Sequence, residues 1–364
     1  MGRIKRIGVL TGGGDCPGLN AVLRGLVKTA SFDHDMQVVG FLDGYAGLLS
    51  DRILRLDGET VSGILPLGGT ILGSSNRDNP FRVPVTVDGT HSFADRSDEA
   101  LRTFDRYGLE LLVVIGGDGS LSIAHQLSGK GLPVLGIPKT IDNDLAATDI
   151  SFGFDTAMTT AAEALDKLHT TAESHHRIMV LEVMGRYAGW IALEAGLAGG
   201  GDVILIPEVP FKVDSVVGAI KERRFRGRTF TLIVISEGAK TEDGQMVVSK
   251  VVEDSTDAIR LGGVGRWLAG ELERHLATEV RVTVLGHLQR GGTPTPFDRV
   301  LATRYGVHAA HCAAEGMRDV MVSLKGTVIT QVPLADAIRE LRRVDPQSQL
   351  VTAARSVGTR FGDE

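Results

Sequence analysis

The sequence has few of the features that mark several large classes of protein. Its 364 residues include only two cysteines, Cys16 and Cys312, which supply neither a disulfide framework nor metal-site spacing and suit a reducing compartment. We interpret both as small apolar side chains of a core. The formal charge of −6 leaves no basic field for nucleic acid. No apolar run reaches the roughly 18 residues of a membrane helix. We therefore expect a soluble, cytoplasmic protein that has no nucleic-acid or membrane partner.

Aromatic residues are also scarce, at 5%, whereas there are 46 glycines. This balance favours strands and helices joined by tight turns over an all-β or coiled-coil protein. The length suffices for two domains, and strand patterns followed by helix patterns recur through both halves of the chain. We predict an α/β fold with two similar doubly wound domains, mainly parallel sheets, and an active site in the cleft between them.

The stretch from residue 133 to residue 144, PVLGIPKTIDND, is the most informative segment. An apolar run at 134–137 is typical of a buried strand, and the loop after it carries Asp142 and Asp144. Two carboxylates this close repel each other unless a cation or a proton lies between them, which suits Mg²⁺ and a substrate hydroxyl. The neighbouring Thr140 hydroxyl can donate to a phosphate or sugar oxygen. TIDND alone fits an ordinary Asx-rich surface turn equally well.

Two glycine-rich loops also follow predicted strands. The strand at 6–10 leads into TGGGDCPG and a helix at 19–30, so backbone amides and a helix N-terminus could hold a phosphate. A turn that serves only chain geometry is the alternative. The buried strand at 111–115 leads into GGDGS and a helix at 121–127, where Asp118 could reach Mg²⁺. The GGDG motif also occurs in lipid kinases and NAD kinases.

The remaining pattern predicts further elements on both sides of these loops. Before 111 it predicts a strand at 37–42, a short strand, a helix and a glycine-rich loop within 52–79, a surface hairpin at 82–91, and a helix at 97–107. Tyr45, after the first of these strands, could lie beside a nucleotide or cap a core, and we favour the core slightly. Beyond 150 it predicts strands at 177–184, 202–206, 229–235 and 281–285 and helices at 156–171, 257–276 and 297–315. Polar residues follow these later strands at the edge where α/β folds bind ligands.

Six ordered blocks, TGGGDCPGLNAVLRG, VVIGGDGS, PKTIDND, VMGRYAGW, ISEG and VTVLGHLQRGGTPTPFDR, resemble the phosphofructokinase family from about Ile7 to Tyr305. The resemblance implies a homodimer or homotetramer whose active sites are shared between subunits. It implies a phosphoryl-donor domain, residues 1–152 plus 289–340, and a fructose 6-phosphate domain, residues 153–288 plus 341–364.

The resemblance also implies the role of individual residues. Asp142 matches the general base that accepts the proton of the sugar 1-hydroxyl. Asp118 matches the residue that binds Mg²⁺. Arg186 matches the residue that stabilises the transferring phosphoryl group, and the Gly13 N–H is expected to donate to the terminal phosphate. The catalytic set is Asp142, Arg186, Thr140 and Gly119, and the donor-binding set is Gly13, Arg77, Gly117, Asp118, Gly119 and Ser120.

The implied sugar site draws on both halves of the chain. It comprises Thr140, Ile141, Asp142, Arg177, Met184, Gly185, Arg186, Glu237, Arg281, His287, Leu288, Gln289 and Arg290. By the same resemblance, His287 and Arg290 of one subunit hold the 6-phosphate, and Arg177 and Arg281 reach in from a neighbouring subunit.

Three features depart from the bacterial ATP-dependent pattern. Lys139 replaces the usual glycine, as in pyrophosphate-using and mixed-substrate relatives. The loop SSNRDNPF also resembles the mixed-substrate group but is one residue longer, so Arg77 is the candidate donor contact and the other residues of the loop stay open as alternatives. At the effector site of the regulated enzymes Arg24 matches, but Lys28 and His169 stand where arginines are expected. The resemblance therefore predicts weak or no activation by ADP and little inhibition by phosphoenolpyruvate.

Two residues favour different phosphoryl donors. Lys139 favours pyrophosphate by resemblance, whereas Gly119 favours ATP because the pyrophosphate-dependent relatives have an aspartate there, where the ATP α-phosphate would lie. We predict an ATP-dependent enzyme that uses Mg²⁺, in which Lys139 is a flexible cation along the donor phosphates, with a pyrophosphate-dependent enzyme as the alternative. An NAD or lipid kinase would lack the PKTIDND, MGR and GHLQRGG blocks. A catalytically dead relative would have lost Asp118, Asp142 or Arg186, and all three are present.

Overall fold

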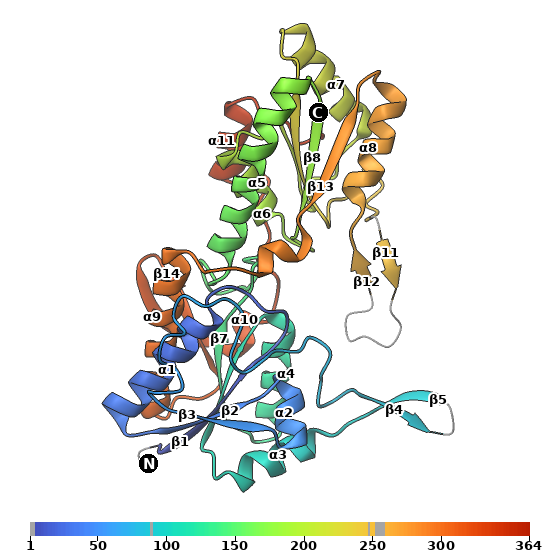
Figure 1. Ribbon diagram of the computed structural model, residues 1–364. Helices are drawn as coiled ribbons and strands as arrows, with labels where there is room; N and C mark the ends of the chain where they lie inside the picture. Colours follow the sequence, from blue (N-terminus) through green and yellow to red (C-terminus); the bar gives the residue numbers. More distant parts are fainter. Residues whose placement is uncertain (1–3, 88–89, 247, 252–258) are drawn as a thin grey trace.

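Two sheets with parallel cores organise the computed structural model, which describes residues 4–87, 90–246, 248–251 and 259–364 (Figure 1). The first sheet has the order β15-β14-β7-β6-β1-β2-β3, in which the two edge strands, β15 and β3, pair antiparallel with their neighbours. Its strands are β1 (Arg6–Thr11), β2 (Gln37–Phe41), β3 (Ile53–Leu56), β6 (Leu111–Gly116), β7 (Val134–Pro138), β14 (Val320–Lys325) and β15 (Val328–Pro333).

The second sheet is smaller and entirely parallel, with the order β13-β8-β10-β9. Its strands are β8 (Ile178–Val183), β9 (Val203–Leu205), β10 (Thr231–Ser236) and β13 (Val280–Val284). Two hairpins project from the body, formed by β4 (Val83–Val87) with β5 (Thr90–Ala94) and by β11 (Val248–Val251) with β12 (Ile259–Leu261) (Figure 1). The predicted α/β fold with mainly parallel sheets is confirmed.

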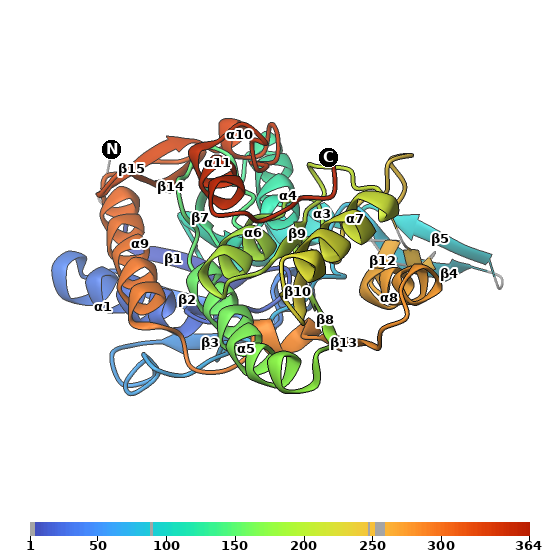
Figure 2. The same cartoon turned by 90° about the horizontal axis from the view of Figure 1, so that it is seen from above.

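The central strands are buried and mainly apolar because both faces of each sheet are covered by helices. In the first sheet, α1 (Leu19–His34) and α9 (Pro296–Ala314) pack side by side on one face (Figure 2). The helices α2 (Tyr45–Ser50), α3 (Ser97–Arg106) and α4 (Asp118–Gly129) cover the other face. Tyr45 is a core residue, as predicted, with 2% of its surface exposed.

The second sheet is covered in the same way. The helices α5 (Phe154–His175) and α6 (Trp190–Ala198) pack on one face, and α7 (Val213–Phe225) and α8 (Val264–His275) on the other. The apolar cluster around α1 and α9 continues without a break to α5 and α6, so one core joins the two sheets. No helix in the described ranges combines the length and the apolar character needed to cross a membrane.

The chain passes between the two sheets three times: into α5, through a 3-10 helix (Gly286–Arg290) into α9, and from α10 (Leu334–Ala337) to α11 (Gln349–Ser356). Asp298 of α9 joins the first two crossings. Its buried carboxylate accepts hydrogen bonds from the Gly153 amide at 2.9 Å and from the Thr156 amide at 2.8 Å. Because burial outweighs these bonds, the pKa of Asp298 rises to about 6.

Two predicted helices differ in the structure. The prediction of a helix within 52–79 is wrong, because the chain forms turns in the part of this segment that follows β3. The helix expected at 257–276 lies partly outside the described residues, at 257–258. Its next part forms β12, and α8 begins only at Val264, because Gly262 (φ 127°) and Gly263 (φ 85°) adopt conformations that interrupt a helix.

Candidate active site

The candidate site lies at the carboxyl edge of the first sheet, where β1, β6 and β7 are neighbours. Parallel strands bring their following loops to one edge, and backbone bonds hold the loops together here. The Gly12 amide donates to the Ile115 carbonyl at 2.9 Å, and the Lys139 amide donates to the Gly116 carbonyl at 3.0 Å. The structure therefore brings together the three loops that the sequence singled out.

The TIDND loop is closed by hydrogen bonds among its own residues. The Thr140 hydroxyl donates to Asp144 Oδ1 at 3.1 Å and accepts from the Asp142 amide at 3.1 Å. The Thr140 hydroxyl therefore donates within the loop in this structure, and its donation to a substrate oxygen stays a prediction. Ser151 Oγ donates to the Thr140 carbonyl at 2.9 Å, and the Ser151 amide donates to Asn143 Oδ1 at 3.0 Å.

Asp142 has one carboxylate oxygen without a partner. Its Oδ1 is buried and makes no hydrogen bond within the described residues. Burial raises the pKa of Asp142 to about 6, against the attraction of Arg290. Burial and the nearby Asp142 carboxylate raise the pKa of Asp144 to about 7. A buried, unpartnered carboxylate oxygen whose pKa is near neutrality suits a group that accepts a proton.

Two cations face the glycine loop that follows β1. Lys139 is only 4% exposed and donates through Nζ to the Gly14 carbonyl, and burial lowers its pKa. The expectation of a flexible lysine is therefore wrong, because this ammonium is fixed inside the loop. Arg290 Nη1 donates to the Asp15 carbonyl at 3.1 Å. The Gly13 amide, at a left-handed φ of 79°, donates to the Ser75 carbonyl at 2.9 Å, so a phosphate would have to displace that bond.

The GGDGS loop forms the N-terminus of α4, which begins at Asp118, three residues earlier than predicted. Its N-cap residue, Gly117, supplies no side-chain hydrogen bond, so the first amides of the helix remain available to an anion. Ser120 is 8% exposed, and its carbonyl accepts a 2.7 Å hydrogen bond from the Tyr45 hydroxyl, which fixes the loop to the core. A Cβ at Gly119 would meet nothing within 4 Å.

Asp118 is the exposed acidic residue at this helix start. No cluster of three or more His, Cys, Asp or Glu side chains forms a metal site in the described part of the chain. Mg²⁺ does not need such a cluster, because it commonly binds one or two carboxylates together with substrate phosphates and water. The charge of Asp118 raises the pKa of both Asp142 and Asp144. The residues present therefore fit a magnesium ion that arrives with a phosphate ligand.

The second sheet contributes residues at the carboxyl ends of β8 and β10. The Met184 amide donates to Gln289 Oε1 at 2.7 Å, and the following Gly185 adopts a φ of 124°. The guanidinium of Arg186 lies 4.8 Å from the centre of the Tyr187 ring. Glu237 follows β10, and burial raises the pKa of its carboxyl.

The 3-10 helix contains four predicted sugar-site residues. His287 is exposed, and Leu288 is 68% exposed. Gln289 is fully buried, and its side chain is engaged with the Met184 amide and, at 3.4 Å, with the Ala157 carbonyl. The Gln289 side chain thus supports the site, whereas Arg290 extends to the glycine loop.

Arg177 and Arg281 lie away from the other candidate residues. Arg177 immediately precedes β8, and Arg281 is the second residue of the parallel strand β13. The length of β8 separates Arg177 from Met184 by on the order of 20 Å. Both arginines instead form ion pairs with Glu279. They are therefore at the amino edge of the second sheet, too far to complete a site in their own subunit.

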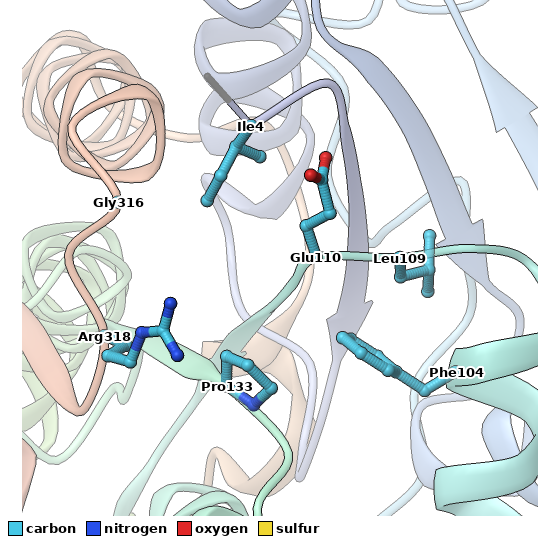
Figure 3. Close-up of a pocket in the computed structure, with 7 residues that line it drawn as sticks. All are labelled: Ile4, Phe104, Leu109, Glu110, Pro133, Gly316 and Arg318. Atoms are coloured by element: carbon cyan, nitrogen blue, oxygen red, sulfur yellow. The ribbon is translucent and has the colours of Figure 1, made fainter. Parts of the chain in front are cut away.

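Figure 3 shows a cavity of about 370 Å³ at the opposite edge of the first sheet. Glu110 and Pro133, which line it, immediately precede β6 and β7. The other lining residues are Ile4, Phe104, Leu109, Gly316 and Arg318. None of the candidate residues lines this cavity, so it is not the predicted cleft. Arg77 lies elsewhere, with an exposed side chain and an amide that donates to Ser75 Oγ at 3.2 Å.

The sequence analysis missed the residues that hold the TIDND loop from outside. Ser151 follows the motif by seven residues, and Arg342 is almost two hundred residues away, with its amide 2.7 Å from the Asp144 carbonyl. The short Ser151 spacing could have suggested a loop closure. No local pattern marks Arg342, because its contact forms only where the segment between α10 and α11 passes beside the TIDND loop.

Comparison with known proteins gives a consistent result. The family model described as phosphofructokinase matches residues 6–313. A Clostridium perfringens protein named ATP-dependent 6-phosphofructokinase 2 is 52% identical over 365 residues, which cover 100% of both chains. A Streptomyces coelicolor protein named pyrophosphate–fructose 6-phosphate 1-phosphotransferase is 50% identical over 358 residues, 98% of this chain and 100% of its own.

The fold comparison agrees. The crystal structure of Pichia pastoris phosphofructokinase in the T-state matches with a TM-score of 0.80 and 30% identity. The match covers 99% of this chain and 37% of the Pichia chain, which is therefore much longer.

Proposed function

Because the chain belongs to the phosphofructokinase family, we propose that it is an ATP-dependent 6-phosphofructokinase. It transfers the γ-phosphoryl group of ATP to the 1-hydroxyl of D-fructose 6-phosphate, and the products are fructose 1,6-bisphosphate and ADP. This is a step of glycolysis, which agrees with a cytoplasmic location.

The observation that carries this proposal is the Asp142 carboxylate. Its buried Oδ1 has no partner within the described residues, and its pKa is raised toward neutrality. The 1-hydroxyl of the sugar would supply the missing partner and give its proton to Asp142 as its oxygen attacks the γ-phosphorus. Positioned proton transfer of this kind contributes roughly 10²- to 10⁴-fold in rate. Thr140 holds the base in place through its bond with the Asp142 amide.

The donor phosphates would lie between the glycine loop and the start of α4. The amides of Gly117, Gly119 and Ser120, at the start of α4, would cradle them, and the Gly13 amide would join after its hydrogen bond to the Ser75 carbonyl is released. Asp118 would hold Mg²⁺, which neutralises charge on the donor phosphates when it is bound. Arg77 is assigned to the donor on resemblance alone.

The charge that develops on the transferring group requires cations. Arg186 would stabilise the phosphoryl group and then the new 1-phosphate. Lys139 and Arg290, which already face the glycine loop, add positive charge from the other side. Because these groups are partly or wholly removed from water, their attraction for phosphate is stronger than at an exposed surface.

The sugar would lie against the second sheet. Ile141, Met184, Gly185 and Glu237 would contact the hexose. The 3-10 helix would present His287, Leu288 and Arg290 toward its 6-phosphate, while the buried Gln289 would hold the Met184 backbone in place. Arg177 and Arg281 are at the wrong edge for their own site. We therefore assign them to the 6-phosphate of a neighbouring subunit in a homodimer or homotetramer.

We assign residues 1–152 plus 289–340 to the donor domain and residues 153–288 plus 341–364 to the sugar domain. Support comes from β14 and β15, which return to the first sheet after the excursion through the second. The substrates meet in the cleft between these domains.

Pyrophosphate is the second candidate donor, because Lys139 lies in the donor loop and one close relative bears a pyrophosphate-dependent name. The decisive measurement is the rate of fructose 1,6-bisphosphate formation at saturating fructose 6-phosphate with ATP or with pyrophosphate. We expect activity with ATP and negligible activity with pyrophosphate. Activity with neither donor would refute the phosphofructokinase assignment.

A further inference from the structure

The third passage of the chain between the sheets runs directly beside the TIDND loop. Between α10 and α11 the segment 338–348 has no helix. Leu341 forms an antiparallel bridge with Leu145, and the Arg342 amide donates to the Asp144 carbonyl at 2.7 Å. The segment therefore continues the backbone pairing of the loop that carries the proposed base.

Arg342 makes a second contact with the same loop through its side chain. Nη1 of the guanidinium donates to the Asn143 carbonyl at 3.2 Å. Asn143 is 3% exposed and has a left-handed φ of 52°, a conformation that costs energy in residues other than glycine unless the surroundings hold it. Arg342 donates one hydrogen bond to this residue and one to the next residue, Asp144.

The other side of Arg342 contacts the second sheet's helix α6. The guanidinium carbon lies 4.2 Å from the centre of the Trp190 ring, and the Trp190 indole N–H donates to the Arg342 carbonyl at 2.9 Å. Trp190 is the first residue of α6 and follows Arg186 by four positions. A single residue is thus bonded to the TIDND loop and to the end of the loop that carries Arg186.

Neighbouring carboxylates fix this arrangement. Glu208 accepts hydrogen bonds from the Val344 amide at 2.9 Å and from the Gly189 amide at 3.0 Å, so it joins the same segment to the same helix start. Burial lowers the pKa of Arg342, while Asp149 and Glu194 oppose that shift. Two nearby carboxylates therefore offset part of the cost of burying this charge.

We propose that Arg342 is a positioning residue that sets Asp142 relative to Arg186 by fastening the TIDND loop to the start of α6. The inference rests on the proposed function, because it assigns the two groups so aligned to base and phosphoryl stabilisation. Nothing in these contacts gives Arg342 a direct role in binding either substrate. A displacement of about 1 Å in a catalytic group can lower the rate by about 10²-fold. We therefore expect the loss of Arg342 to lower kcat.

The test compares Arg342→Ala, Arg342→Lys and Trp190→Phe with the exposed neighbour variant Arg343→Ala. We expect Arg342→Ala to lower kcat by roughly 10- to 100-fold while the KM of each substrate stays within about threefold. Arg342→Lys keeps the charge but loses the planar stack and the forked donor, so its kcat should fall between those of the wild type and Arg342→Ala. Trp190→Phe loses the indole N–H and part of the ring that stacks on the guanidinium but keeps an aromatic face, so it should have a smaller effect. Arg343→Ala should behave as the wild type.

Hydrogen exchange supplies a readout that does not require activity. In Arg342→Ala, hydrogen exchange should become faster in both the peptide that covers 140–145 and the peptide that covers 187–190. In Arg343→Ala, exchange should be unchanged in both peptides. The two tryptophans, Trp190 and Trp267, allow a matched optical measurement: in a Trp267→Phe background, removal of the Arg342 guanidinium should change the emission of Trp190.

Three results would overturn the proposal: a kcat within threefold of the wild type in folded Arg342→Ala, a loss confined to KM, or faster exchange in only one of the two peptides. If Arg342→Ala does not fold, Arg342→Lys and Trp190→Phe decide by the same criteria. A wild type that lacks activity would refute the proposed function, while joint exchange of the two peptides would still establish the coupling.

Discussion

Replacement of Gly119 by aspartate tests the donor assignment directly, and the structure indicates that the change leaves the fold intact. Gly119 is the second residue of α4, and a Cβ there meets nothing within 4 Å. An acidic side chain in the first turn of a helix interacts favourably with the helix dipole, by roughly 0.3–1 kcal/mol. We therefore expect the free energy of unfolding of Gly119→Asp to equal or exceed that of the wild type.

The same carboxylate would lie among the amides that are proposed to cradle the donor. At an effective dielectric constant near 20, two unit charges about 6 Å apart repel by about 3 kcal/mol, and water screening reduces this to roughly 1.4 kcal/mol. Since each 1.36 kcal/mol is a factor of ten, we expect kcat/KM for ATP to fall about 10- to 100-fold.

Two matched variants separate charge from volume. Gly119→Asn adds nearly the same volume without charge, and Gly119→Ala adds only a methyl group. A coupled assay with ATP and with pyrophosphate, at saturating fructose 6-phosphate, measures all four proteins. We expect Gly119→Ala to stay near the wild type and Gly119→Asn to lose less than Gly119→Asp. The reasoning is refuted if Gly119→Asp leaves the ATP kinetics unchanged, or if the wild type prefers pyrophosphate.

Four further outcomes are expected. Asp142→Asn should lose about two to four orders of magnitude in kcat, and a loss of less than tenfold would place the base elsewhere. The folded-state pKa of Asp142 is raised from 3.8 to about 6, so the stabilising contribution of Asp142 is complete below pH 3.8 and is lost as the pH rises through 6. Urea unfolding should therefore show that the free energy of unfolding of Asp142→Asn increases relative to that of the wild type across this interval. The kcat/KM of the wild type should fall with decreasing pH near 6 to 7, where Asp142 and Asp144 take up protons, and a flat profile down to pH 5 would contradict this. Arg177→Ala and Arg281→Ala should mainly raise the KM for fructose 6-phosphate, and mixed oligomers of Arg281→Ala with Asp142→Asn should regain activity, which a one-chain site would not allow. ADP should not sharpen the fructose 6-phosphate curve, since the His169 ring packs 5.0 Å from the Phe230 ring rather than offering an arginine; a sigmoidal curve sharpened by ADP would refute this.

Much of the architecture could be predicted because the strands are buried on both faces. Every residue of β6, β8 and β10 is buried, so each strand appears in the sequence as a mainly apolar run, which only Glu182 interrupts with a charge. The polar residues that follow these runs then had to share an edge. This reasoning placed Asp118, Asp142 and Glu237 correctly at carboxyl edges without any contact information.

The errors arose where long-range contacts decide. Lysine is normally exposed, and no local signal announces that Lys139 is 4% exposed with its ammonium bonded to Gly14. No local pattern likewise announces that the Gly13 amide, which the resemblance assigns to the terminal phosphate, donates to the distant Ser75 carbonyl in this structure. The helix predicted at 257–276 began too early because an amphipathic pattern cannot show that the preceding residues pair as a hairpin.

The electrostatics of the site explain why so many unfavourable groups are kept together. Burial raises the pKa of Asp142, Asp144 and Glu237 and lowers that of Lys139, so each group would be easier to charge in water. A fold selected for stability alone would replace such groups with apolar side chains, because buried ion pairs rarely repay their desolvation. A magnesium ion, a donor phosphate and a sugar hydroxyl would each supply a partner of the required charge or polarity. Binding of these ligands would therefore offset part of the desolvation of the buried groups.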